Sequence, residues 1–518
     1  MNHLKKLLGY IVTMAMVFTL TGVGIGAVHA EDTTYKLSLT NNGQTNHTFE
    51  VYQVFTGDLK DSTLSNIQWG NGITDEGKSK LGTASSKAES LIGQNDNSAV
   101  ARTFANDLVD NNYLQKGTEV TVKPNETQDV TGLAAGYYLV KDKAESQKDQ
   151  VNGANTLYIL KVVKDTTATT KLDVPTVTKK VKDKNDTEGT TSEWQDSADY
   201  DIGDTIDYKI DGTLPGNYDK YTTYKYEFTD TMSAGLTYNA PAKLYVVNDS
   251  AETEIVNSET KAYYTETSEN GTIKWTFSNL KDLKNVTASS IIRVKYSATL
   301  NQNAVIGATG NPNTVNLTYS NNPNKTDGGE TGKTPDDTNI VFTYEAIFNK
   351  VNENKQALAG AKFELFKKVK KTDNTGFDWV SKGNLDPDPT EVSSGKYTYT
   401  FKGLDDGEYK LVETQTPAGY NTMEDKIFTI EATHTQDPEK LELTGLRVTG
   451  GLISDEGANK NATVDVSKGT ISADIVNKSG TELPETGGMG TTLLYVLGGV
   501  LVALAAAYVI YTKKHEKA

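Results

Sequence analysis

The side chains that carry most enzyme chemistry are scarce in this sequence. It contains no cysteine, and after residue 30 and before the C-terminal apolar run it contains only His47 and His434. Disulfides, thioesters and cysteine nucleophiles are thereby excluded, and no Ser/His/Asp order or metal-ligand cluster is found. Residues 183–186 have the spacing of a calcium loop, but Glu188 stands where an EF-hand loop needs glycine, so a hairpin turn is predicted. We expect no enzyme activity, no metal and no cofactor, and any covalent staple must use other residues.

The C-terminal end combines three features in a fixed order. A pentapeptide comes first, Leu483-Pro484-Glu485-Thr486-Gly487. An apolar run over 493–511 follows, about long enough to span a bilayer as a helix, and then three lysines, Lys513, Lys514 and Lys517. The ordered set resembles the sorting signal of sortase substrates. That resemblance implies cleavage between Thr and Gly of the pentapeptide and transfer of the Thr carbonyl to an amine.

The N-terminal end is typical of a secretory signal peptide. Lys5 and Lys6 precede an apolar run over 7–23, and Val28 and Ala30 take the −3 and −1 positions of a cleavage site. The net charge of −16, with 68 acidic and 52 basic residues, argues against binding to nucleic acid. We therefore expect a secreted protein anchored to the cell wall, with a transient membrane span before sortase cleavage.

Between these ends, short strands and turns recur. Thr, Val and Tyr are frequent, 44 glycines punctuate them, and no βαβ alternation appears. This predicts an all-β protein of tandem immunoglobulin-like β-sandwich domains, with some helix at 80–112 in the first of them. A polar stretch over 320–338 predicts a linker or long loop. The predicted division is 1–30 signal peptide, 31–172 first domain, 173–339 second domain, 340–478 third domain and 479–518 sorting signal.

The third domain contains a recognisable motif. Residues 409–420 read Tyr-Lys-Leu-Val-Glu-Thr-Gln-Thr-Pro-Ala-Gly-Tyr. This resembles the E-box of Gram-positive pilins and of collagen-adhesin B-type domains, with Thr416 in place of the alanine that the family favours. Stretches 346–366 and 475–477 resemble the opening hairpin and last strand of that domain. The resemblance implies a major pilin subunit assembled by sortase.

The resemblance also implies a self-formed isopeptide bond in the third domain. The residues that match are Lys350 and Asn477 as the bonded pair and Glu413 as the catalyst. Strand parity agrees, since Phe348 and Lys350 share a face and Ile475 and Asn477 share another. Burial would lower the pKa of the lysine and raise that of the carboxyl, so that a neutral amine can attack the amide.

The second domain resembles the fimbrial D2-type domain of the same pilins. The matching stretches are 176–181, 202–208, 228–231 and 313–319. By the same logic the resemblance implies a Lys179–Asn313 bond with Asp230 as catalyst. Parity with Val177 and Val181 favours Lys179 over its neighbour Lys180, but the two adjacent lysines leave a one-residue ambiguity.

The first domain matches the family least. Residues 133–142 echo the E-box strand, and Asp142 falls where Glu413 falls in the third domain. A final-strand asparagine is missing unless Asn155 serves. We therefore predict no cross-link here, with Lys36 as the candidate lysine if one forms.

Backbone pilins offer a lysine to the next subunit, often in a Tyr-Pro-Lys motif that this sequence lacks. Lys171 is the nearest lysine before the predicted first junction, and Lys164, Lys180 and Lys182 are alternatives.

Two functions remain in competition. The first is the structural backbone subunit of a covalent pilus, and the second is a monomeric wall-anchored adhesin on a stapled stalk. The expected partners are a pilus-type sortase, a housekeeping sortase, identical subunits head to tail, and peptidoglycan. A host matrix protein or cell receptor is left open, and nucleic acid is excluded.

Overall fold

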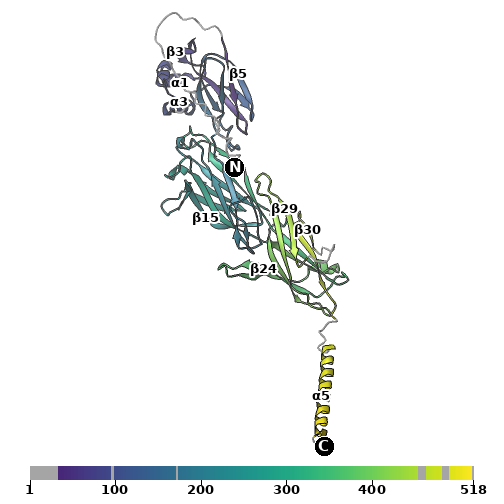
Figure 1. Ribbon diagram of the computed structural model, residues 1–518. Coiled ribbons are helices and arrows are strands. Elements are labelled where there is room, and N and C mark those ends of the chain that lie inside the picture. Colours follow the sequence, from purple (N-terminus) through teal and green to yellow (C-terminus); the bar gives the residue numbers. More distant parts are fainter. Residues whose placement is uncertain (1–32, 95–97, 171–172, 453–461, 481–488, 516–518) are drawn as a thin grey trace.

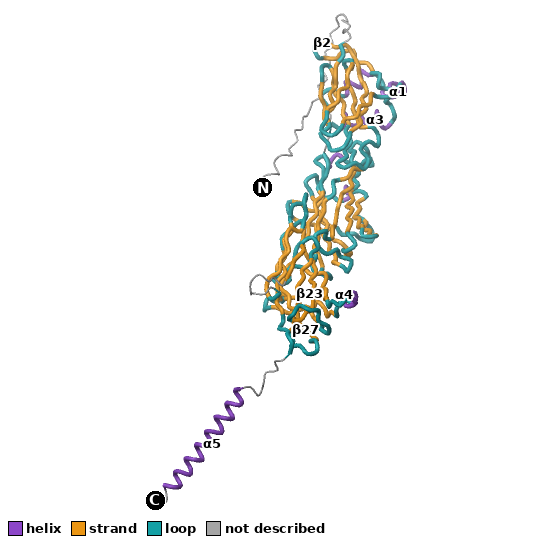
Figure 2. Tube along the Cα trace, turned by 90° about the vertical axis from the view of Figure 1, so that its right-hand side faces the viewer, coloured by secondary structure: helices purple, strands orange, loops and turns teal. Residues whose placement is uncertain are grey.

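The computed structural model describes residues 33–94, 98–170, 173–452, 462–480 and 489–515. Figure 1 shows three β-rich units that follow one another along an elongated molecule, and Figure 2 shows the same row after a quarter turn. We call them the first, second and third units. Each contains two main sheets, so the predicted all-β architecture of tandem sandwiches is confirmed.

The first unit combines two sheets with three helices. One sheet has the order β5-β1-β8, and the other has the order β3-β2-β6-β7 with β4 beside β2. Residues 136–140 of β6 are all buried, because one face packs on the Leu37 cluster and the other on the Phe104 cluster. The predicted helix content is confirmed. The bounds are β1 Tyr35–Thr40, β2 His47–Lys60, β3 Thr63–Trp69, α1 Asp75–Leu81, α2 Ala84–Ser90, α3 Ala99–Asp110, β4 Thr118–Val122, β5 Thr127–Leu133, β6 Gly136–Asp142, β7 Leu157–Val162 and β8 Thr166–Thr169.

The second unit packs a seven-stranded sheet on a five-stranded sheet. The first has the order β12-β22-β20-β14-β18-β17 with β21 beside β20, and the second has the order β16-β15-β19-β13-β9. The bounds are β9 Val177–Val181, β12 Ser197–Asp199, β13 Thr205–Gly212, β14 Tyr226–Met232, β15 Leu236–Asn248, β16 Ala251–Glu254, β17 Thr265–Glu269, β18 Thr272–Phe277, β19 Ile291–Leu300, β20 Asn311–Ser320, β21 Thr331–Lys333 and β22 Asp337–Phe342.

Two local predictions in this unit have different outcomes. Residues 183–191 form the predicted hairpin, with β10 (Lys184–Asn185) paired to β11 (Thr190–Thr191). The prediction of a linker or loop over 320–338 is wrong in part, because β21 and the start of β22 lie within it. β21 is only three residues long, and only the polar start of β22 falls within this stretch, so the alternation there is too weak to recognise in the sequence.

The third unit packs a four-stranded sheet on a five-stranded sheet. Their orders are β26-β23-β31-β30 and β25-β24-β27-β28-β29. The first strand of the unit, β23, pairs in parallel with its last strand, β31. The bounds are β23 Tyr344–Asn352, β24 Lys362–Lys370, β25 Phe377–Leu385, α4 Pro389–Ser393, β26 Thr398–Leu404, β27 Gly407–Gln415, β28 Lys426–His434, β29 Leu443–Gly450, β30 Ala462–Asp465 and β31 Thr470–Asn477.

The C-terminal segment forms one helix, α5 (Met489–His515). Within the part of the chain whose side chains the structure describes, no helix is long and apolar enough to cross a membrane. The membrane span over 493–511 therefore stays a prediction. The signal peptide at 1–30 and its cleavage site lie outside the described residues.

Candidate functional site

In the third unit, the amine of Lys350 is held inside the sandwich. Lys350 lies on β23 and is 1% exposed. Its Nζ donates to the carbonyl oxygens of Val351 (3.2 Å) and Ile475 (3.0 Å), the latter on the neighbouring strand β31. Burial lowers the pKa of Lys350 to about 8, so a neutral amine is accessible near physiological pH.

The carboxylate of Glu413 faces the amide of Asn477. Glu413 lies on β27 of the opposite sheet, and Asn477 is the last residue of β31. The Asn477 Nδ2 donates to Glu413 Oε1 at 3.0 Å and to Oε2 at 2.9 Å. The backbone N–H of Met423 (3.1 Å) and the hydroxyl of Thr416 (3.3 Å) also donate to Oε2. Thr416, the departure from the E-box, thus contacts the acid of the motif.

In the second unit, Lys179, Asp230 and Asn313 are each 0% exposed. They come from β9, β14 and β20, so the group lies between the two sheets. The Nζ of Lys179 donates to Asp230 Oδ1. Burial lowers the pKa of Lys179. Lys180, by contrast, is partly exposed and pairs with Asp196.

Sequence reasoning missed the residue that connects this second group. The hydroxyl of Tyr296 on β19 accepts from Lys179 Nζ at 2.6 Å and from Asn313 Nδ2 at 2.9 Å, and it donates to Asp230 Oδ2. Burial and the Asp230 carboxylate raise the pKa of Tyr296 well above its ordinary value, so the phenol keeps its proton. The strict alternation of β19 places position 296 inside, which is the only signal the sequence offers.

The position of Asn313 also corrects one expectation. The family resemblance puts the asparagine on the last strand of the domain. Here it lies on β20, and the sheet continues through β21 and β22. The added strand β22 pairs with β20 and covers its other edge, so the strand that carries Asn313 is not the last strand of this sheet.

In the first unit, the acid that echoes the E-box contacts a histidine. Asp142, at the end of β6, is buried, and its Oδ1 lies 2.9 Å from Nδ1 of buried His47. Its Oδ2 accepts from the backbone N–H of Thr156 at 2.7 Å. Lys36 is exposed and pairs with Asp129 instead, so it is wrong as the candidate partner. Asn155 bonds to Asn321 of the second unit.

The structure describes only some of the residues that we expect to take part in polymerisation. Lys171 and the pentapeptide Leu483-Pro484-Glu485-Thr486-Gly487 lie outside the described residues. Among the alternative acceptors, Lys164 is exposed. Lys182 donates to the carbonyl of Ser192 at 3.1 Å.

Comparison with known proteins identifies the domains. Residues 345–446 match a prealbumin-like fold domain (SpaA), residues 202–323 match the Cna-B-like domain of Gram-positive pilin backbone subunit 2, and residues 475–518 match the LPXTG cell wall anchor motif. The trypsin-resistant surface T6 protein of Streptococcus pyogenes serotype M6 is 28% identical over 413 residues, which are 68% of this chain and 71% of that protein.

The chain is a sortase-assembled backbone pilin of the Gram-positive type. A solved structure of the T6 backbone pilin of S. pyogenes serotype M6 has a TM-score of 0.52 at 19% identity, covers 87% of this chain and 99% of its own, and supports the fold. The full-length major pilin SpaD of Corynebacterium diphtheriae gives a TM-score of 0.47 at 18% identity and covers 87% of this chain and 98% of its own.

This backbone pilin is a structural protein of the cell-wall-anchored pilus and not an enzyme. The anchor motif and the pilin domains imply sortase processing and polymerisation. The alternative of a monomeric adhesin is not favoured, because the matching domains and the relative belong to backbone subunits.

Proposed function

We propose that this backbone subunit staples itself with two amide bonds, Lys179–Asn313 and Lys350–Asn477, using Asp230 and Glu413 as catalysts. The observation that carries the proposal is the burial of both lysines with lowered pKa inside groups that also hold an acid and an asparagine. A charged amine is costly to bury, and a buried lysine of lowered pKa beside an acid and an asparagine favours chemistry over packing alone.

The reaction needs no cofactor. The neutral lysine amine attacks the asparagine Cγ, an N–C bond forms, and the bond from Cγ to Nδ2 breaks. The attacking nitrogen gives up one proton and keeps the other as the amide N–H. The leaving nitrogen takes one proton through the carboxyl group, and ammonia departs. Glu413 suits this role because it contacts the Nδ2 that leaves, and Asp230 suits it because it contacts the attacking Nζ.

Intact mass tests this proposal directly. The mature chain, residues 31–486, should be lighter than its sequence mass by two ammonia molecules. Peptide mapping should join the segment of Lys350 to that of Asn477, and the segment of Lys179 to that of Asn313. A mass equal to the unmodified sequence would reject both bonds.

We further propose that Thr486 of one subunit joins a lysine of the next, with Lys171 as the acceptor. Head-to-tail joining gives an open filament when the rotation closes no ring. The acceptor would precede the second unit and the donor would follow the third, which sets the polarity. A pilus-type sortase would make this bond, and a housekeeping sortase would attach the finished pilus to peptidoglycan. A host matrix protein or receptor stays open as a further partner.

The domain division 31–172, 173–339 and 340–478 is also kept as a proposal. The three groups of sheets follow it closely. Strand β22 crosses the second boundary and pairs within the sheet of the second unit, which argues for a boundary nearer residue 343.

A further inference from the structure

Two hydroxyl groups lead from the Glu413 carboxylate of the third unit towards solvent. Thr416 Oγ1 donates to Glu413 Oε2 at 3.3 Å and lies 2.8 Å from Thr422 Oγ1. Glu413 is buried, Thr416 is partly buried and Thr422 is exposed, so the row runs from the interior to the surface. A carboxylate can only accept, so Thr416 uses its single hydroxyl hydrogen on Glu413 and accepts that of Thr422.

Backbone hydrogen bonds hold the loop that carries both threonines. The N–H of Met423 donates to Glu413 Oε2 at 3.1 Å. The N–H of Asn421 donates to the carbonyl oxygen of Lys478, just after β31, at 3.0 Å. The loop is thus fixed both to the acid and to the end of β31, which keeps the two hydroxyls in line.

The same carboxylate faces the reacting amide on its other side. Both of its oxygens accept from Asn477 Nδ2, at 3.0 and 2.9 Å. Glu413 therefore lies between the amide and the hydroxyl row. A proton that reaches this carboxyl can pass to Thr416 when the hydroxyl hydrogens turn, with no movement of the backbone.

The proposed Lys350–Asn477 bond releases a proton when it starts from a charged lysine. The lysine of the unfolded chain is an ammonium at neutral pH. An ammonium and an asparagine amide give the new amide, one ammonia and one proton, whereas a neutral amine gives the amide and ammonia alone. A charge is costly to keep inside the sandwich, so this proton has to reach solvent.

We propose that Thr416 and Thr422 form the path by which Glu413 exchanges this proton with solvent. The inference rests on the proposed Lys350–Asn477 bond. Both threonines act through Glu413 and are positioning residues, since neither contacts the reacting amine or amide. The sequence carries Thr416 where the E-box favours alanine, so this path is a property of this chain rather than of the motif.

The transfers balance as follows. Lys350 gives its ammonium proton to the Glu413 carboxylate and attacks as a neutral amine. The carboxyl donates one proton to the leaving nitrogen and receives one from the attacking nitrogen, so it still carries the extra proton when ammonia departs. It passes that proton to Thr416, Thr416 passes its own to Thr422, and Thr422 passes its own to water. Each threonine ends with one hydroxyl hydrogen, and Glu413 is a carboxylate again.

The second unit differs in the part of the chain that the structure describes. The carboxylate of Asp230 there hydrogen-bonds to Lys179 and Tyr296, and all three residues are buried. Formation of the bond in that unit should therefore not depend on Thr416 or Thr422, which provides a comparison within one molecule.

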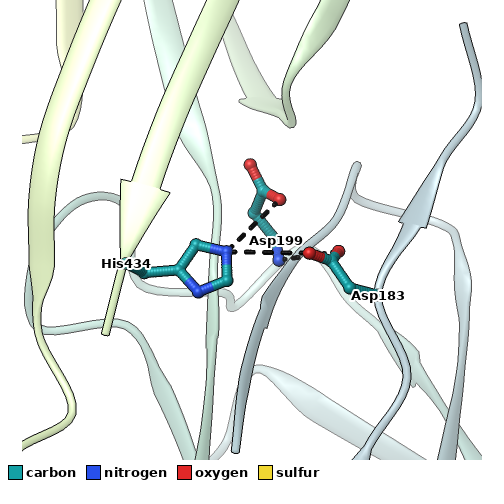
Figure 3. A group of neighbouring side chains, drawn as sticks. All are labelled: Asp183, Asp199 and His434. Atoms are coloured by element: carbon teal, nitrogen blue, oxygen red, sulfur yellow. Dashed lines mark hydrogen bonds and ion pairs between the residues drawn. The ribbon is translucent and has the colours of Figure 1, made fainter. Parts of the chain in front are cut away.

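Two acidic groups at the junction of the second and third units offer a further contrast. The Nε2 of His434 lies 3.7 Å from Asp183 Oδ2 and 3.9 Å from Asp199 Oδ1 (Figure 3). Lys367 contacts Asp201 at 2.9 Å. In both groups the acids outweigh burial and raise the pKa of the cation. These cations keep their protons in ion pairs, whereas the reacting lysine has to lose its own.

The groups that titrate beside Glu413 determine the pH dependence. Among the described residues these are Lys350 on β23 and Tyr399 on β26. Burial, then Asp386 and Glu413, raise the pKa of Tyr399 to about 12, so it stays neutral below pH 10. Burial outweighs Glu413 and lowers the pKa of Lys350 to about 8. Above that pH the buried lysine brings no extra proton, and the path is no longer needed.

Refolding of the mature chain (31–486) tests the proposal. The chain is collected as inclusion bodies, dissolved in guanidinium chloride and diluted into buffer at pH 7. Intact mass and peptide mapping then follow how fast the segments of Lys350 and Asn477 join in chains that began at the full sequence mass. Thr422→Val keeps the shape of the side chain and leaves the Thr416–Glu413 contact in place, but it breaks the path. We expect joining to slow by about tenfold, less than the loss of a positioned acid or base would cause.

Substitutions at Thr416 should follow the hydroxyl. Thr416→Val should slow joining as much as Thr422→Val, and Thr416→Ser should restore the wild-type rate. Thr416→Ala should fall between them, because a water molecule can occupy the vacated space and carry the proton. The matched control is Thr414→Val at an exposed position of β27, which should join at the wild-type rate. In every variant the Lys179–Asn313 bond and the folding rate, followed by intrinsic fluorescence, should stay unchanged.

The pH profile separates a proton path from a structural role. The deficit of Thr422→Val should be largest at pH 7 and should vanish as the pH rises well above 8. Joining at the wild-type rate in Thr422→Val would overturn the proposal even if Thr416→Val is slow, since Thr416 would then only anchor the acid. A deficit that stays the same at every pH would also overturn it. Failure of the wild type to join at all would instead reject the Lys350–Asn477 bond, and the path with it.

Discussion

Lys350 and Asn477 lie on parallel neighbouring strands that are the first and last strands of the third unit. Lys350 is paired in register with Ile475, and its Nζ donates to the Ile475 carbonyl, so the amine lies two residues from the asparagine along β31. Pulling on the two ends of this unit would load these adjacent strands. A covalent bond between them would carry that load past the hydrogen-bonded core.

The second unit is arranged differently. Lys179 belongs to the five-stranded sheet and Asn313 to the seven-stranded sheet. A bond there would join two facing sheets rather than two neighbouring strands, and it would resist separation of the sandwich.

Replacement of the third-unit acid should prevent its staple. We expect Glu413→Ala to lose one ammonia instead of two, because no carboxyl group would remain to transfer protons. By analogy with a disulfide closing a loop of about 100 residues, the lost cross-link should cost about 4.7 kcal/mol of unfolding free energy. Mass spectrometry, thermal melting and protease digestion measure the effect. The control is Glu424→Ala at an exposed position; unchanged mass and melting in Glu413→Ala would show that this acid is not the catalyst.

Removal of one hydroxyl should slow the second staple. Tyr296→Phe keeps the ring but removes the group that contacts Lys179, Asp230 and Asn313. We expect a folded protein whose intact mass, sampled over time after synthesis, shows delayed or incomplete loss of the second ammonia. Complete loss at the wild-type rate would show that the Tyr296 hydroxyl only packs between its neighbours.

The junction of the second and third units should lose stability as pH rises. The carboxylates of Asp183 and Asp199 outweigh burial and raise the pKa of His434 to about 9, so its contribution is complete below about pH 6.5 and is lost as the pH rises through 9. The pKa of Asp406 is raised to about 7, so ionisation of this acid on going from pH 4 to 7 also disfavours the folded state.

Both titrations destabilise the folded state as the pH rises. The melting temperature of the chelator-treated mature chain should therefore fall from pH 5 to pH 9. In His434→Gln the part of that fall above pH 7 should be smaller. A melting temperature that rises over this range would contradict the assignment.

Loss of the acceptor should stop polymerisation without stopping wall attachment. We expect Lys171→Ala, expressed in a cell with its own pilus sortase, to lose the ladder of detergent-resistant multimers on an immunoblot while retaining wall-linked monomer. Lys164→Ala is a matched comparison, since Lys164 is exposed and, like Lys171, precedes the predicted first junction in the sequence. If the ladder survives in Lys171→Ala, attention moves to Lys164, Lys180 and Lys182.

The resemblance to the E-box domain selected Lys350, Glu413 and Asn477 in the third unit, and strand parity agreed that they point inward. A strand repeats every two residues, so a local pattern of apolar neighbours tells which side chains point inward. The same rule chose Lys179 over Lys180 for burial, and the structure places them accordingly. The C-terminal sorting signal could also be recognised from the sequence, because such a signal acts as a linear sequence and requires no fold.

Parity could not tell what an inward side chain meets. Lys367 shares the inward face of β24 with Phe363 and Leu365, just as Lys350 shares its face with Phe348. Yet Asp405, Asp201 and Asp186 outweigh burial and raise the pKa of Lys367, whereas burial lowers that of Lys350 to about 8. Asp201 and Asp186 belong to the second unit and contact Lys367 across the junction of the two units. Each of them lies more than 160 positions from Lys367 in the chain. Coulombic interaction depends on distance in space, so folding alone decides that one buried lysine is held as a cation and the other has a lowered pKa.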